Sequence, residues 1–242
     1  MVVGRRALGW TAAAVLAMSV VTLVASSALG APAKPLGALA QLSGKTGCVT
    51  HDGTSEDGAN TCGKARGMAE TESAVVSPDG RNVYVGSYPD NGDSLGAGFA
   101  IFKRNKSTGT LKQLGGKAGC ITGDGASIAG AGTCTEGRGI FDSMGDGRDL
   151  VFTSNGRWAY IATNGFGSEP GGIMIFKRSP STGALKQLSG QAGCLTTDGS
   201  DQNGPGACKV DSHLLQASGL TFSSDERFLY VTGTGDSSQI EA

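Results

Sequence analysis

Residues 75–85 of the 242-residue chain read VVSPDGRNVYV, and this stretch decides the fold. Two apolar runs flank the turn sequence Pro78-Asp79-Gly80, an arrangement typical of a β-hairpin. The stretch returns as FTSNGRWAYI at residues 152–161 and as FSSDERFLYV at residues 222–231. The chain is therefore expected to repeat one β-sheet unit along its length.

Two further segments recur after the first and second hairpins. The segment IFKR at residues 101–104 returns at 175–178, and STGTLKQL at 107–114 returns as STGALKQL at 181–188. With the hairpin they predict four antiparallel strands per unit, and tandem units of this kind are typical of β-propeller blades. We interpret the chain as an all-β propeller with about two and a half blades and an incomplete ring. The repeats cover roughly residues 37–110, 111–184 and 185–242.

The composition supports layered β-structure and excludes one class of partner. Glycine accounts for 41 residues, well above the usual share of about 7%, and its excess falls in the turns and in the Gly-rich segments between the repeats. The formal net charge is only −1, whereas a nucleic-acid binder shows a basic excess. No nucleic-acid partner is expected.

The six cysteines repeat with the same period as the strands. They form three pairs, and the two cysteines of each pair are 14 residues apart. Within every pair, Asp-Gly begins four residues after the first cysteine. The repeat symmetry favours three local disulfides over zinc, because structural zinc sites use more closely spaced cysteines. The predicted bonds are Cys48–Cys62, Cys120–Cys134 and Cys194–Cys208.

The first 33 residues have the pattern of a secretory signal peptide. Arg5 and Arg6 precede an uncharged run over residues 7–24, and small residues follow up to Ala33. Cleavage is expected after Gly30 or Ala33, and an uncleaved membrane anchor is the alternative. The mature chain is expected to be secreted or to lie in the periplasm or cell envelope, with no membrane partner after cleavage.

The core motif SPDGRxxYV at residues 77–85, with IFKR and STGxL, resembles the blades of the lactonase-like seven-bladed β-propellers. These proteins are relatives of 6-phosphogluconolactonase and the fungal muconate cycloisomerase, and more distantly of the YVTN surface repeats. The resemblance covers roughly residues 36–242 and implies ligand binding at a central channel lined by the first strand of each blade. The disulfide-closed insertions depart from the usual blade and favour an exported, scaffold-like branch. No motif matches the family's catalytic residues, so the catalytic residues stay unknown.

Polar residues at the start of the predicted first strands are candidates for the channel mouth. When the repeats are aligned on Ser77, Thr153 and Ser223, two equivalent positions near the start of the first strand carry charged or polar residues in every repeat. A carboxylate there is suited to act as a general base, and an arginine binds a carboxylate in bidentate fashion. Ordinary solvated strand ends are the alternative. The candidate ligand-binding residues are Glu70, Glu72, Asp146, Arg148, Gln216 and His213.

Two weaker signals point to other chemistry. The string GDSLG at residues 92–96 matches an esterase motif but lies in a Gly-rich loop before a predicted strand rather than at a strand-to-helix turn. Asp52, Glu56 and Asp57 in one loop, and Asp198, Asp201 and Asn203 in another, are oxygen ligands suited to calcium. Turn formation by the Asp-Gly sequences is the preferred explanation. No cofactor and no metal site are predicted, and calcium remains the alternative.

The two ends of the chain bear on its partners. Residues 37–44 resemble the fourth strand of the later repeats, and residues 240–242 resemble the beginning of a third strand. Closing a ring is expected to require missing blades or self-association. Two functions follow as hypotheses. One is an exported binding or scaffold module for an extracellular ligand or partner protein. The alternative is a lactone hydrolase or cycloisomerase acting at the central channel, inactive in a truncated chain.

Overall fold

The computed structural model describes residues 39–88, 98–141, 149–165, 169–214, 216–233 and 240–241. The chain divides into the units Met1–Ala40 and Gln41–Ala242, and all elements below belong to the second. Across the described ranges, no helix has the length and apolar character needed to cross a membrane. The predicted signal peptide at residues 1–33 lies outside the described residues.

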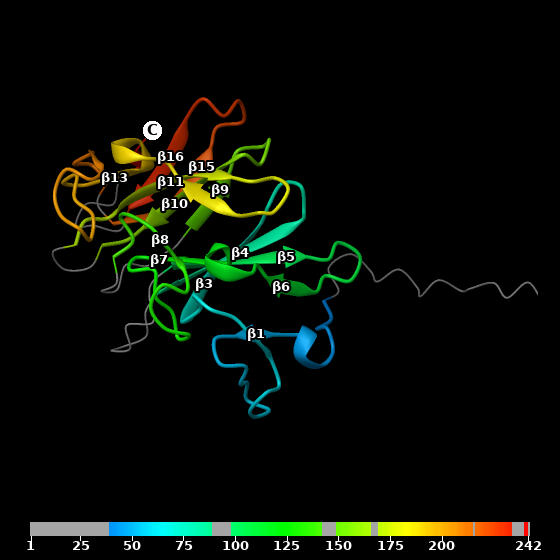
Figure 1. The fold of residues 1–242 in the computed structure, drawn as a ribbon. Helices are drawn as coiled ribbons and strands as arrows, with labels where there is room; N and C mark the ends of the chain where they lie inside the picture. The colour runs from blue at the N-terminus through cyan, green and yellow to red at the C-terminus, as the bar shows by residue number, and fades with distance from the viewer. Residues whose placement is uncertain are drawn as a thin grey trace, which may run out of the picture. The chain divides into compact units, whose positions relative to one another are not determined.

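Three sheets follow one another along the chain, and in each the strands formed by the repeated motifs pair antiparallel (Figure 1). The first contains β3 (Glu70–Val76), β4 (Asn82–Tyr88), β5 (Gly98–Arg104) and β6 (Leu111–Gln113). The second contains β9 (Asp149–Phe152), β10 (Trp158–Thr163), β11 (Gly172–Arg178) and β12 (Leu185–Gln187). The third contains β15 (Ala217–Phe222), β16 (Leu229–Gly233) and β17 (Ile240–Glu241). The predicted all-β fold with propeller-like blades is confirmed.

The hairpin turn between the first two strands of each sheet is fixed by local chemistry. In the first sheet, Ser77 donates its hydroxyl to Asp79 Oδ1 (2.7 Å), which also accepts the N–H of Arg81 (3.1 Å). Gly80 adopts φ +69°, a backbone conformation that residues other than glycine rarely adopt. Thr153 with Asn155, and Ser223 with Asp225, make the equivalent hydroxyl bond in the later sheets. The sequence SPDG and its variants therefore set the turn.

The outer edge of each complete blade is more elaborate than the predicted single fourth strand. In the first sheet β6 pairs with one half of β5 and β7 (Cys120–Thr122) pairs with the other half, and the short 3₁₀ helix η2 (Gly116–Gly119) separates them. After the cysteine loop, β8 (Thr135–Glu136) pairs parallel to β7. The second sheet repeats this edge with η3 (Gly190–Gly193), β13 (Cys194–Thr196) and β14 (Lys209–Val210).

The first cysteine loop has no blade of its own among the described residues. Its edge consists of η1 (Gly44–Thr46), β1 (Val49–Thr50) and β2 (Gly63–Lys64), and β1 pairs only with β2 in a two-stranded parallel sheet. The prediction of a fourth strand at 37–44 is wrong for residues 39–43, which form no strand. The later copies of this segment form strands because they pair with β5 and β11.

Apolar side chains fill the space between successive sheets. One cluster joins Tyr84 and Ile101 of the first sheet to Leu150, Ile161 and Met174 of the second. A second cluster joins Ile173 of the second sheet to Leu220 and Val231 of the third. The inner strands also lie in series, because β9 contacts both β3 and β15. Face-to-face packing of consecutive sheets is the arrangement expected for neighbouring blades.

Candidate functional site

The three cysteine loops form the most regular feature of the chain. Disulfides join Cys48 to Cys62, Cys120 to Cys134, and Cys194 to Cys208, with Cα–Cα distances of 4.9–5.0 Å. The predicted pairing is confirmed. Inside each loop the same small turn recurs, as antiparallel bridges between Ser55 and Gly58, Ser127 and Gly130, and Asp201 and Gly204. We call residues 48–62, 120–134 and 194–208 the first, second and third loops.

An arginine that follows the first loop is bound at the outer edge of the first sheet. Arg66 lies four residues after Cys62, and its Nη1 donates to the carbonyl oxygen of Thr133 in the second loop (2.7 Å). Its Nη2 donates to the carbonyl oxygens of Gly116 (2.9 Å) and Leu114 (3.4 Å). This guanidinium thus ties the segment after one loop to the next loop.

A glutamine on the same edge binds the backbone of that arginine. Gln113 accepts the N–H of Arg66 at its Oε1 (3.1 Å), and its Nε2 donates to the carbonyl oxygens of Arg66 (2.7 Å) and Gly119 (2.9 Å). The side chain and the backbone of Arg66 are therefore held by the same short segment, residues 113–119, together with Thr133. We call this arrangement an arginine socket.

The second sheet carries a second arginine socket, in which the equivalents of Thr133, Leu114 and Gln113 bind Arg138 one repeat later. Arg138 lies four residues after Cys134 and donates to the carbonyl oxygens of Ala207 (3.1 Å) and Leu188 (2.6 Å). Gln187 accepts the N–H of Arg138 (2.8 Å) and donates to its carbonyl oxygen (2.9 Å). The first, second and third loops are thereby linked in sequence by two half-buried arginines.

A further side chain joins the second and third loops directly. Gln202 of the third loop donates to the carbonyl oxygens of Gly123 (2.7 Å) and Gly137 (2.8 Å) and accepts the N–H of Gly139 (3.0 Å). Its side-chain oxygen and nitrogen therefore bind backbone groups of the second loop and of the segment that follows it. The loops thus form a continuous row whose geometry depends on backbone carbonyl groups.

Three of the loop carboxylates considered for calcium form hydrogen bonds within the turns. Asp52 accepts the N–H of Thr54 (2.9 Å), Asp198 accepts that of Ser200 (2.9 Å), and Asp201 accepts that of Asn203 (2.8 Å). The Thr54 backbone and hydroxyl lower the pKa of Asp52, and the Ser200 hydroxyl and backbone lower that of Asp198. Among the residues that the structure describes, no three His, Cys, Asp or Glu side chains form a metal-type cluster.

The channel-mouth candidates are spread over two sheets and one loop. Glu70 begins β3 half-buried, and Glu72 is exposed at the irregular pairing between Thr71 and Ser73. Gln216 precedes β15 with φ +50°. His213 is exposed, with its Nδ1 3.5 Å from Asp211. Asp146 and Arg148, and the GDSLG string at residues 92–96, lie outside the described residues.

A neighbouring carboxylate that sequence reasoning missed joins two inner strands. Asp149 accepts the N–H of Leu150 at Oδ1 (2.8 Å) and the N–H of Leu220 at Oδ2 (2.8 Å). It thereby ties β9 to β15. In the repeat alignment Asp149 occupies the position of Ser73. This change from a serine to a carboxylate was the one signal in the sequence that could have identified Asp149.

A second missed feature lies between the first two sheets. The Arg178 side chain on β11 is only 1% exposed and donates to both oxygens of Asp79 (3.0 Å), to Asn82 Oδ1 (2.7 Å) and to the Tyr84 hydroxyl (2.8 Å). It also donates to the carbonyl oxygen of Gly156 (3.1 Å). Burial raises the pKa of Tyr84 to about 12, so its hydroxyl stays protonated and donates to the carbonyl oxygen of Gly183 (2.6 Å). This network holds two blades together.

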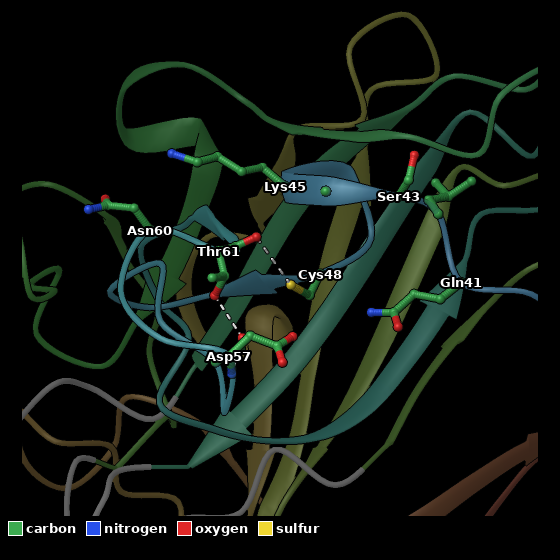
Figure 2. A pocket seen from close by; sticks show the side chains of 10 residues that line it. Gln41, Ser43, Lys45, Cys48, Asp57, Asn60 and Thr61 are labelled. Carbon is green, nitrogen blue, oxygen red and sulfur yellow. Dashed lines mark hydrogen bonds between the residues drawn. The ribbon is translucent and has the colours of Figure 1, made fainter.

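Two cavities lie along the outer edges. One, of about 590 Å³, is lined at the first loop by Gln41, Leu42, Ser43, Gly44, Lys45, Cys48, Ser55, Asp57, Asn60 and Thr61. Figure 2 shows the side chains of Gln41, Lys45, Asp57 and Thr61 arranged around it. The other, of about 760 Å³, borders the second arginine socket and includes Arg138 and Gln187 among its lining residues. Both cavities belong to the loop row rather than to the starts of the inner strands.

Comparisons with known proteins found solved structures but no family. No family model matches the chain, and no curated protein does. A crystal structure of a protein from Lactobacillus plantarum is 14% identical with a TM-score of 0.42, and the match covers 72% of this chain and 38% of that chain. The periplasmic gluconolactonase of Pseudomonas aeruginosa is 12% identical with a TM-score of 0.34, and the match covers 69% and 39%. The chain thus spans less than two fifths of the length of either structure.

Proposed function

We propose that this chain is an exported binding or scaffold module of the lactonase-like propeller type. It holds an extracellular ligand or partner protein through the row of disulfide-closed loops. The observation that carries the proposal is the linkage of the three loops by Arg66 and Arg138 onto backbone carbonyl groups. Such a row keeps a fixed shape on binding, which limits the ordering cost of an interface.

Export is supported by the three disulfides, because such bonds persist in oxidising compartments. The pattern of residues 1–33 is that of a signal peptide. The proposed site of action is therefore outside the cytoplasm.

Catalysis at a central channel is the competing function. Asp149 near the proposed channel mouth accepts two backbone N–H groups, which is a structural role. Fold alone does not decide between binding and catalysis, because propeller folds carry both. Glu70, Glu72, Gln216 and His213, with Asp146 and Arg148, remain the proposed channel residues.

One pair of measurements tests the proposed function on the oxidised chain. Opening of glucono-1,5-lactone is followed by base uptake at constant pH, with and without calcium, and no rate above the uncatalysed reaction is expected. Co-sedimentation with purified peptidoglycan sacculi is expected for the oxidised chain and not for the reduced chain, because reduction releases the loops. A lactone rate well above background that Glu72→Ala removes would instead establish the enzyme.

A further inference from the structure

The loop row contains a third copy of the arginine socket. The first loop and the segment before it repeat the residues that hold Arg66 and Arg138, at the same spacing. Gln41 takes the place of Gln113 and Gln187, and its Nε2 donates to the carbonyl oxygen of Gly47 (3.3 Å). The equivalent bonds of Gln113 and Gln187 run to Gly119 and Gly193. The glutamine is therefore oriented in the same way in all three copies.

The carbonyl groups that bind the guanidinium are repeated as well. Arg66 donates to the carbonyl oxygens of Thr133, Leu114 and Gly116. The residues at these positions one repeat earlier are Thr61, Leu42 and Gly44, and all three line the cavity of about 590 Å³ at the first loop. No arginine is among the residues that line it. We propose that this cavity is a binding site for an arginine side chain supplied by a segment outside residues 41–242.

The charge of the cavity suits a guanidinium. Asp57 lines it, whereas the equivalent positions of the second and third loops carry Ala129 and Asn203. A carboxylate strengthens the binding of a cation that already has carbonyl acceptors. Lys45 also lines the cavity. Its equivalent Lys117 lies on η2 next to Gly116, whose carbonyl oxygen binds Arg66, so a lysine at this position is compatible with a bound arginine.

The described arginines of this type are already bound. Arg66 and Arg138 lie in their own sockets, and the position four residues after Cys208, which would carry the next arginine, is the exposed Ser212. The occupant is therefore a segment of another repeat of the same kind, with an arginine four residues after a cysteine. A socket that holds both guanidinium and backbone selects such a segment over free arginine.

This inference rests on the proposed function, because it gives the loop row a partner of stated chemistry. Its test is separate from the lactone and sacculus measurements. A chain that opens the lactone, does not co-sediment with sacculi and still binds the arginine segment would contradict the proposed function but support the arginine site.

The probe is the acetylated and amidated peptide Gly-Lys-Ala-Arg-Gly-Met, a copy of residues 63–68. It is titrated into the oxidised, ¹⁵N-labelled chain, and the amide signals of Gly47 and Thr61 are followed. We expect saturable shifts at these two residues. The peptide with glutamine in place of the arginine should bind at least about tenfold more weakly, since it loses charge-assisted hydrogen bonds to the carbonyl groups. The lysine peptide should also bind more weakly, because an ammonium does not reproduce the fork of the guanidinium.

Chain variants and a free ligand complete the test. Gln41→Ala should weaken peptide binding about fivefold by removing the bonds to the peptide backbone, and Asp57→Asn should weaken it about threefold. Gln191→Ala, a glutamine on η3, is the matched control and should leave binding unchanged. L-Arginine amide should bind at least about fivefold more weakly than the peptide. Equal binding of the glutamine peptide, equal binding of L-arginine amide, or binding unaffected by Gln41→Ala in a folded chain overturns the inference.

Discussion

Arg178→Ala is expected to lower the free energy of unfolding by about 3 kcal/mol, the lower end of the range for removing one partner of a buried charge pair. The side chain of Arg178 is almost fully buried and donates to Asp79, Asn82 and Tyr84 from the neighbouring blade. Its loss leaves these acceptors without their donor, and two of them, Asn82 and Tyr84, are buried away from water. Urea unfolding followed by the fluorescence of Trp158 measures the change.

Arg104→Ala is the matched control. Arg104 occupies the position of Arg178 in the first sheet and makes the same bond to the turn, from Nη1 to the carbonyl oxygen of Gly80 (3.2 Å). It is half-buried, and its loss should lower stability by at most about 1 kcal/mol. Equal losses in the two variants would contradict the role assigned to the junction.

The same junction makes the free energy of unfolding depend on pH in the acidic range. Burial acts to raise the pKa of Asp79, but bonds from the Ser77 hydroxyl, the Arg81 N–H and Arg178 outweigh it and lower this pKa to about 2. Because the folded pKa lies below the unfolded value of 3.8, the stabilisation from Asp79 is complete above about pH 4 and is lost as the pH falls toward 2. The wild-type chain should therefore lose stability more steeply than Arg178→Ala between pH 4 and 2. Parallel curves would contradict this.

Removing the second disulfide with Cys120→Ala and Cys134→Ala should lower stability by about 3 kcal/mol, the value expected for a closed loop of this length. Both sulfurs are buried, and the carbonyl oxygen of the adjacent Thr133 binds Arg66. Urea unfolding under non-reducing conditions measures the loss.

The first disulfide is the matched control, because its loop has the same length. If chain entropy alone acts, the pair Cys48→Ala and Cys62→Ala should lower stability equally. The structure adds a native-state contribution at the second loop, where Thr133 holds a guanidinium, and so we expect the second pair to cost more. A larger loss from the first pair would contradict the importance of the arginine socket for the loop row.

Much of the fold could be predicted because its signals are local. The alternation of apolar residues around SPDG sets β3 and β4, and the recurrence of IFKR and LKQL sets the next strands. The three disulfides follow from cysteine pairs that recur with one spacing. The prediction of an outer strand was wrong for residues 39–43, because a strand also needs a hydrogen-bonded neighbour, which the local sequence does not supply.

The side-chain contacts at the candidate site could be predicted from the sequence less well than the strands. The alignment placed charged residues at the starts of the inner strands, but the carboxylate that joins two of these strands is Asp149, one position beyond the aligned Arg148. Gln113 and Arg66 recur as Gln187 and Arg138, and this repetition was visible in the sequence. Nothing in that pattern stated that the members of each pair bind one another.

The sequence by itself determined the repeating blade, its turns and its disulfides, because each depends on residues within one repeat. Only the tertiary structure decided where the arginines go. Arg178 meets Asp79 across 99 residues, and Arg66 meets Gln113 across 47. Such contacts depend on how one sheet is set against the next, and packing between sheets has no fixed spacing along the chain.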